Sequence, residues 1–286
     1  MLMNMTDLLK VAKENHFAVP AFNVGTSEIL KGVLEACEEK NSPVIIQIHP
    51  VELDFAGDGF ADMVIAEARK THIPVVVHLD HGGSVTEIMR AIRDGFTSVM
   101  IDTSSYPFEE NVRRVKEVVA LAHPLNISVE AELGTIGSTG NGAEDGANKI
   151  IYTDPDLAVK FVEETQADTL AVAIGTAHGI YPKDMKPELK LDLLEELVKV
   201  IDIPLVLHGG SANPDEEIEE SVNIGISKIN IASDIKVAFF DGYRKVLEDP
   251  DIREPHEVYA AAFPTMKKVI FHKIGLFHSA GKADLY

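Results

Sequence analysis

The sequence has little cysteine and no long apolar run, and both shortages narrow the choice of protein class. The single cysteine, Cys37, excludes an internal disulfide framework and fits a reducing compartment. No apolar stretch approaches the roughly 20 residues that a membrane-spanning helix needs. Residues 1–16 are polar and helix-patterned, without the apolar segment of a secretion signal. We therefore expect a cytoplasmic protein with no membrane partner.

Positive charge is also scarce, because 26 lysines and arginines stand against 46 aspartates and glutamates, for a formal net charge of -20. Such an acidic surface repels nucleic acids and anionic lipids, which bind to basic surfaces. We therefore expect no nucleic-acid partner, and we interpret most of the excess acid as solvated helix surface. A phosphorylated ligand would have to be bound by local groups rather than by the overall charge.

The chain does have apolar bulk, since 45% of its 286 residues are hydrophobic, which is enough for one large core. Eight apolar runs alternate with helix-like stretches, and we expect them to form strands: 17–23, 43–49, 73–80, 97–102, 127–133, 168–175, 203–208 and 226–231. Continuously apolar strands are typical of a parallel sheet that helices cover on both faces. Eight such units predict an α/β fold, a single (β/α)8 TIM-barrel domain over residues 1–286.

Additional helices and two loops complete the expected barrel. We expect a helix over Met5–His16 to pack on the N-terminal end of the barrel, and residues Pro255–Phe277 to add helices beyond the eighth unit. The loops Gly134–Lys149 and Ala177–Glu188 are rich in glycine and proline. Loops of this kind in a compact barrel are usually functional, so we interpret both as lids. The alternative is a surface excursion without a role.

Three apolar runs end in the dipeptide His-Gly, at His81, His178 and His208. A barrel carries its chemistry at the C-terminal ends of its strands, so these imidazoles are expected to converge. Neutral imidazole is a favoured zinc ligand, and three protein ligands with one open position are usual for catalytic zinc. The pattern therefore predicts a zinc site. The alternative for any single histidine is a hydrogen-bonded residue of the core.

Other polar residues end the expected strands at the same face: Asn23, Asp80, Asp102, Glu132 and Asn230. Asp80 precedes His81 directly, and the chain can turn at a strand end so that both side chains reach the mouth. A carboxylate beside zinc can act as a base while the metal polarises a carbonyl. The alternative role for Asp80 is to orient a zinc-binding imidazole.

The seventh and eighth expected strands end in small residues that suit phosphate. Gly209, Gly210 and Ser211 follow one strand, and the segment Asn230–Ser233 follows the other. Glycine turns and helix N-termini present free backbone N–H groups to anions. The loops after strands seven and eight are also the usual phosphate site of this barrel. We therefore expect a phosphate-binding corner beside the zinc site.

Several longer motifs carry a family resemblance. They read Ala-Val-Pro-Ala-Phe-Asn at 18–23, His-Leu-Asp-His-Gly at 78–82, Val-Glu-Ala-Glu-Leu-Gly at 129–134, Ala-Ile-Gly-Thr-Ala-His-Gly at 173–179, Val-Leu-His-Gly-Gly-Ser at 206–211 and Lys-Ile-Asn at 228–230. Together they resemble the class II, zinc-dependent ketose-bisphosphate aldolases, most closely the tagatose- and fructose-bisphosphate branch. The likeness runs nearly from end to end of the chain.

The resemblance implies a lyase that cleaves a phosphorylated ketose reversibly to dihydroxyacetone phosphate and an aldehyde, and that forms homodimers or homotetramers. The site residues that it implies are zinc on His81, His178 and His208, with Glu132 as an alternative ligand; Asp80 as the acid/base at the hydroxyl on the fourth carbon; Glu144 as the proton donor on a loop; Asn23 and Asp102 near the substrate; Gly209, Ser211, Asn230 and Ser233 at the phosphate; and a monovalent cation, sodium or potassium, near Gly179, Gly209 and Ser211.

One departure from the family bears on the substrate. Many members carry a small residue after the second strand, where this chain has His49. A bulky imidazole there is expected to reshape the pocket. Three alternative functions stay open on the sequence: an aldolase for a ketose 1-phosphate that lacks the second phosphate, a barrel metallohydrolase with zinc-bound hydroxide, and a non-catalytic subunit, since a barrel does not guarantee activity.

Overall fold

A computed structural model of the chain describes residues 1–138, 150–179 and 188–286. Its strands are β1 Val19–Asn23, β2 Val44–Ile48, β3 Val75–Gly82, β4 Ser98–Ile101, β5 Ser128–Leu133, β6 Gly137–Ser138, β7 Thr169–Val172, β8 Ala177–His178, β9 Leu205–Leu207 and β10 Ile226–Ile231. Its helices are α1 Met5–Glu14, α2 Ser27–Glu39, α3 Pro50–Ala56, α4 Asp58–Lys70, α5 Val85–Arg93, α6 Phe108–Ala122, η1 His123–Leu125, α7 Pro155–Thr165, α8 Leu191–Val200, α9 Asp215–Ile224, α10 Ser233–Val246, α11 Pro255–Leu276 and η2 Lys282–Leu285.

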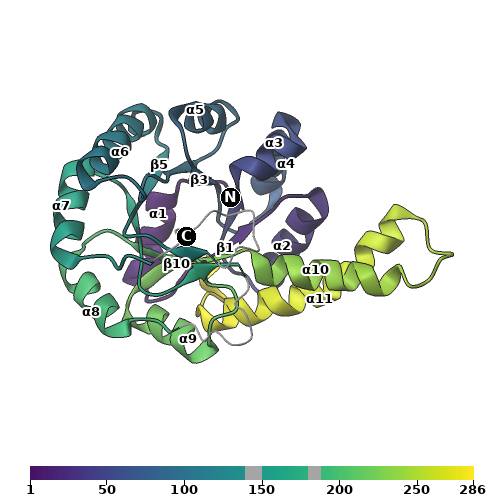
Figure 1. Ribbon diagram of the computed structural model, residues 1–286. Helices are drawn as coiled ribbons and strands as arrows, with labels where there is room; N and C mark the ends of the chain where they lie inside the picture. The colour runs from purple at the N-terminus through teal and green to yellow at the C-terminus, as the bar shows by residue number, and fades with distance from the viewer. Residues whose placement is uncertain (139–149, 180–187) are drawn as a thin grey trace.

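Within these described residues, eight parallel strands close into a barrel in the order β1-β10-β9-β7-β5-β4-β3-β2. The helices form a ring around the strands (Figure 1), so the outward apolar side chains of every strand are covered. The predicted (β/α)8 barrel is therefore confirmed, and each expected strand overlaps one barrel strand. The short strands β6 and β8 pair with each other outside the barrel.

The helix α1 covers the N-terminal end of the barrel, as expected. Its apolar residues Met5, Leu8 and Leu9 form a cluster with inward side chains of the first three strands, including Val19 and Val76. The cluster is completely buried apart from 1% exposure of one phenylalanine. Because apolar packing fills this end, a ligand can reach the interior only from the opposite, C-terminal end.

The inward-facing residues change from apolar to polar along the barrel axis, which corrects the expectation of continuously apolar strands. In β5 and β10, polar residues alternate with apolar ones, and both kinds are buried. The polar members that share the barrel interior include Asn23, Gln47, His78, Asp80, Ser98, Ser128, Glu130, Glu132, Lys228 and Asn230. Alternation with a period of two places them all on one face of each strand. The interior is thus polar toward its open end.

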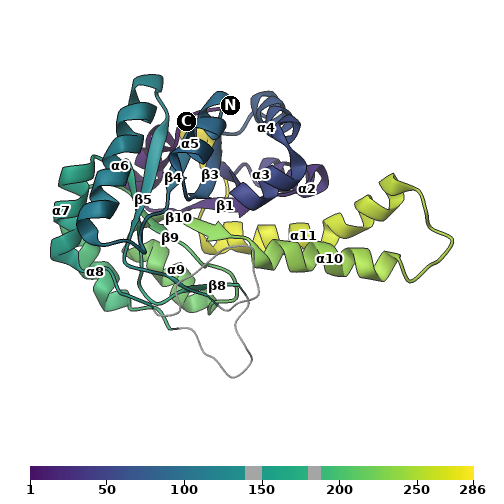
Figure 2. The same ribbon diagram turned by 45° about the horizontal axis from the view of Figure 1, so that its top comes forward.

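The helix α10 completes the eighth unit, and α11 extends the fold beyond it. The pair α10 and α11 projects from the side of the barrel as an antiparallel arm (Figure 2), and α11 also packs against α2. The predicted tail helices are therefore a single helix, α11, which contains Pro264. No helix in the described ranges combines the length and apolarity needed to span a bilayer.

Candidate active site

The end of β3 turns so that two neighbouring side chains reach the barrel mouth. His81 has a positive φ of 51°, which is uncommon for a residue with a side chain. The pairing register with β4 also shifts between Leu79 and Gly82. A regular strand would send Asp80 and His81 to opposite faces. The irregular end instead leaves Asp80 fully buried in the interior and His81 at the mouth, as the sequence predicts.

His178 reaches the site by a different route from the one expected. The predicted strand 168–175 ends at Val172, and His178 lies in β8, which pairs with β6. The chain turns at Gly175, whose φ is 124° and where a Cβ atom would lie 2.4 Å from the carbonyl oxygen of Glu188. Only glycine tolerates that conformation and contact. The assumption that His178 ends a barrel strand is therefore wrong, although its position near the mouth is as predicted.

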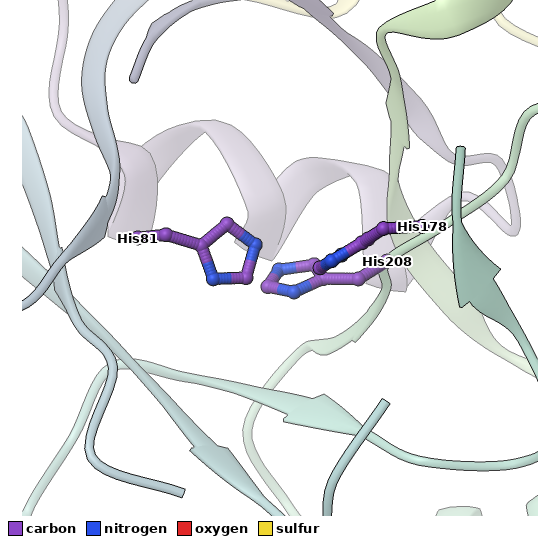
Figure 3. A group of neighbouring side chains, drawn as sticks. All are labelled: His81, His178 and His208. Atoms are coloured by element: carbon purple, nitrogen blue, oxygen red, sulfur yellow. The ribbon is translucent and has the colours of Figure 1, made fainter. Parts of the chain in front are cut away.

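The imidazoles of His81, His178 and His208 converge on one point (Figure 3). The ring centroid of His81 lies 4.9 Å from that of His178 and 4.7 Å from that of His208. One ring nitrogen of each residue lies within 4.8 Å of the others, and Asp102 and Glu132 form a second such group with His81. Three strand-end regions more than 25 residues apart in sequence thus supply one cluster of ligand atoms.

Two of these imidazoles, those of His81 and His208, are hydrogen-bonded to carboxylates through the nitrogen that faces away from the cluster. Nδ1 of His81 lies 2.7 Å from Asp102, and Nε2 of His208 lies 2.9 Å from Glu130. A carboxylate only accepts, so both nitrogens donate, which assigns the lone pair to the opposite nitrogen. Within the described residues, His81 Nε2 and His208 Nδ1 are buried and make no hydrogen bond of good geometry, although Oε2 of Glu132 lies 3.1 Å from Nδ1 of His208. Carboxylate-oriented imidazoles with unused inner nitrogens are typical of metal ligands.

The electrostatics of the cluster favour positive charge at its centre. Burial lowers the pKa of His81, but the carboxylates of Asp80 and Asp102 outweigh burial and raise that pKa well above its usual value. Burial and Asp102 together raise the pKa of Glu132, whose Oε2 lies 3.1 Å from Nδ1 of His208. A cation bound between these groups would replace the protons that they otherwise attract.

A buried ion pair that sequence reasoning missed lies beneath His208. Lys228 Nζ donates to both oxygens of Glu130, at 2.8 and 2.9 Å, and both side chains are fully buried. Burial raises the pKa of Glu130, but Lys228 and His208 outweigh it and hold that pKa far below its usual value. The signal was present in the sequence, because a charged residue interrupts each of these two apolar strands.

Asp80 is held by two amides in the barrel interior. Its Oδ2 accepts a hydrogen bond from Nδ2 of Asn23 at 2.7 Å, and its Oδ1 accepts one from Nδ2 of Asn230 at 3.2 Å. Gln47 in turn donates to Asn23 at 3.0 Å. Burial raises the pKa of Asp80, but the cationic forms of His81 and Lys228 outweigh burial and hold it well below its usual value. Asp80 is thus an oriented and ionised carboxylate.

The residues that we expect to bind phosphate lie where the neighbouring strands β9 and β10 end. Gly210 N–H donates to the carbonyl of Asn230 at 3.1 Å, and the Ser211 hydroxyl accepts from the N–H of Asp234 at 3.3 Å. These bonds bring the glycine turn to the first turn of α10, which begins at Ser233. Gly209 has a φ of 63° and approaches the carbonyl of Ala177 closely. Gly179 precedes the undescribed residues, and Glu144 lies outside the described residues.

Comparisons with known proteins agree with this geometry. A family model described as fructose-bisphosphate aldolase class-II matches residues 3–282. The YdjI aldolase from Escherichia coli K12 is 37% identical, with a TM-score of 0.87 over 99% of this chain and 100% of that chain. A putative fructose-1,6-biphosphate aldolase from Coccidioides immitis is 27% identical, with a TM-score of 0.89 over 99% of each chain. A fructose-bisphosphate aldolase from Campylobacter jejuni, 23% identical over 98% of this chain and 96% of that chain, shares the fold at a TM-score of 0.80.

Proposed function

Because the chain belongs to the class-II fructose-bisphosphate aldolase family, and is therefore a carbon–carbon lyase, we propose that it cleaves a phosphorylated ketose to dihydroxyacetone phosphate and an aldehyde. The observation that supports this most is the convergence of three imidazoles on one point, with Nε2 of His81 and Nδ1 of His208 buried on the inner side of the cluster. A coupled aldolase assay that detects dihydroxyacetone phosphate tests the proposal.

The donor set fits a zinc ion. His81, His178 and His208 would hold it, and Glu132 is close enough to serve as an alternative ligand. Three imidazoles leave one coordination position open, as in catalytic rather than structural zinc sites. When bound there, zinc supplies Lewis-acid polarisation of the substrate carbonyl. The carboxylates Asp102 and Glu130 would keep two of the imidazoles in the required tautomer.

The protein's own groups carry the proton transfers. Asp80 is ionised and oriented by Asn23 and Asn230, so it is placed to accept the proton of the substrate hydroxyl whose carbon–carbon bond breaks. The reverse reaction returns that proton from the same carboxyl group. Glu144 remains our predicted proton donor to the other fragment, on the residues that the structure does not describe. Asp102 lines the pocket beside His81.

The substrate phosphate would occupy the corner between β9 and α10. Backbone N–H groups of Gly209 and Ser211 and the first turn of α10 at Ser233 would supply uncharged donors there, while Gly210, whose N–H is bonded to Asn230, holds the turn in place. We also propose that a sodium or potassium ion assists near Gly179. These local donors would bind an anion despite the acidic surface.

We propose in addition that the chain folds as a single domain, that it assembles as a homodimer or homotetramer, and that it is located in the cytoplasm.

Removal of the metal separates this mechanism from a lysine-based one. We expect a chelator to abolish cleavage and zinc to restore it, while borohydride added with substrate leaves no covalent adduct. Lys228, the fully buried lysine of the barrel interior, is engaged by both oxygens of Glu130 and is not free to form a Schiff base. The measurements are turnover after dialysis and intact-protein mass after borohydride treatment. A trapped adduct, or full activity without metal, would reject the proposal.

A further inference from the structure

The pocket beside the metal cluster contains carboxylates but no lysine or arginine in its described lining. Its volume is about 390 Å³, and its walls come from the ends of β2 to β5 and from His178. The charged residues among the lining are Glu87, Asp102 and Glu132, apart from histidines. A second phosphate bound in this pocket away from the metal would meet these carboxylates with no lysine or arginine of the described lining opposite it, which is unfavourable at short range.

Two lysines that lie outside the described lining, Lys236 and Lys282, are already engaged by other side chains. Lys236 on α10 pairs with Glu52 on α3, with 2.6 Å between Nζ and Oε1, and both side chains are largely buried. Lys282 lies over the ring of Phe17, next to the apolar cluster at the closed end of the barrel. Neither lysine is therefore an uncompensated cation at the mouth.

One side chain of the pocket wall is a neutral hydrogen-bond donor. His49 follows β2, is 8% exposed, and has its ring centroid 6.3 Å from that of His81. Its Nδ1 accepts a hydrogen bond from the N–H of Val51 at 3.3 Å, which caps the N-terminus of α3. An Nδ1 that accepts carries no hydrogen, so the ring is neutral and its hydrogen is on Nε2.

We propose that His49 determines specificity for the aldehyde half of the ketose, donating from Nε2 to a hydroxyl group there, and that this half carries no phosphate. The substrate class is then the ketose 1-phosphates rather than the 1,6-bisphosphates. This inference rests on the proposed function and deepens it. A ketose without the second phosphate also leaves space for the bulky imidazole after β2, because a hydroxyl group is smaller than a phosphate and needs no cation to bind it.

Paired substrates test the inference directly. The zinc-loaded enzyme is assayed with fructose 1-phosphate against fructose 1,6-bisphosphate, and with the corresponding tagatose pair. We expect kcat/KM to be at least about tenfold higher for the monophosphate of one pair, because the charged side chains of the described lining, apart from histidines, are all carboxylates. A preference for the bisphosphate would overturn the inference and leave the aldolase intact. Failure to cleave any of the four would instead count against the proposed function.

The variant His49→Ser tests the residue itself. Serine is a good N-cap, so α3 keeps its capping bond while the Nε2 donor is lost. We expect kcat/KM for the monophosphate to fall about tenfold, mainly through KM, with no fall for the bisphosphate. His72→Ser, an exposed histidine with a side chain 69% accessible, is the matched control and should change neither. An equal change for both substrates would overturn the role of His49. Zinc content and melting temperature should be unchanged in both variants.

Discussion

Replacing Asp80 with asparagine should lower kcat for ketose cleavage by about 10²- to 10⁴-fold while leaving bound zinc unchanged. The substitution keeps the size of the side chain but removes the group that accepts the proton. Asp80 is fully buried and its Oδ1 is 4.0 Å from Nε2 of His81, so it lies beside the three imidazoles without being one of the proposed ligands. The measurement is steady-state turnover together with metal content per chain.

The control for this experiment is Asp62→Asn, an exposed carboxylate on α4. It should retain the turnover of the unmodified enzyme. Turnover of Asp80→Asn within tenfold of the unmodified enzyme would reassign the base to another group. Loss of zinc from Asp80→Asn would show that the carboxylate supports the metal rather than the proton transfer.

Replacing Lys228 with methionine should lower the free energy of unfolding by about 3–5 kcal/mol, because it leaves the charge of Glu130 buried without its main partner. Glu130 then keeps the hydrogen bonds from His208 at 2.9 Å and from the Thr169 hydroxyl at 3.3 Å, with His78 more distant at 3.9 Å. Urea titration of the metal-free protein, compared with the unmodified chain, measures the difference. The methionine fills similar volume, so cavity formation contributes little.

Two further variants show how much of that loss of stability comes from the buried charge of Glu130. Lys199→Met removes an exposed partner of Glu195, with side chains 70% and 56% accessible, and should cost less than about 1 kcal/mol. The double variant Lys228→Met with Glu130→Gln removes the buried charge and should recover part of the loss. Equal stability of Lys228→Met and Lys199→Met would mean that the buried pair adds nothing to the fold.

The barrel could be predicted from the sequence because its strands are short, apolar and regularly separated by amphipathic stretches. The strand Ile226–Ile231 matches its predicted bounds, and the helix Pro255–Leu276 ends one residue before the predicted end of the tail. The turn that brings Asp80 and His81 to the same mouth could also be anticipated, since a strand followed by glycine rarely continues straight. In each case local sequence and global fold favour the same structure.

The remaining details depend on tertiary contacts that local patterns do not encode. His178 sits on a two-residue strand whose partner, β6, is separated from it by more than 35 residues. The Glu130–Lys228 pair joins two strands 98 positions apart, and only closure of the barrel brings them together. The helix α3 is capped by an imidazole, which is not among the residues that usually signal a helix start.

The most direct test of the account is anomalous diffraction at the zinc edge from crystals of the zinc-loaded enzyme. The account predicts one strong peak about 2 Å from Nε2 of His81, Nδ1 of His208 and a ring nitrogen of His178, the usual zinc–imidazole distance. A peak located elsewhere, or three imidazoles that stay apart with no metal between them, would contradict it.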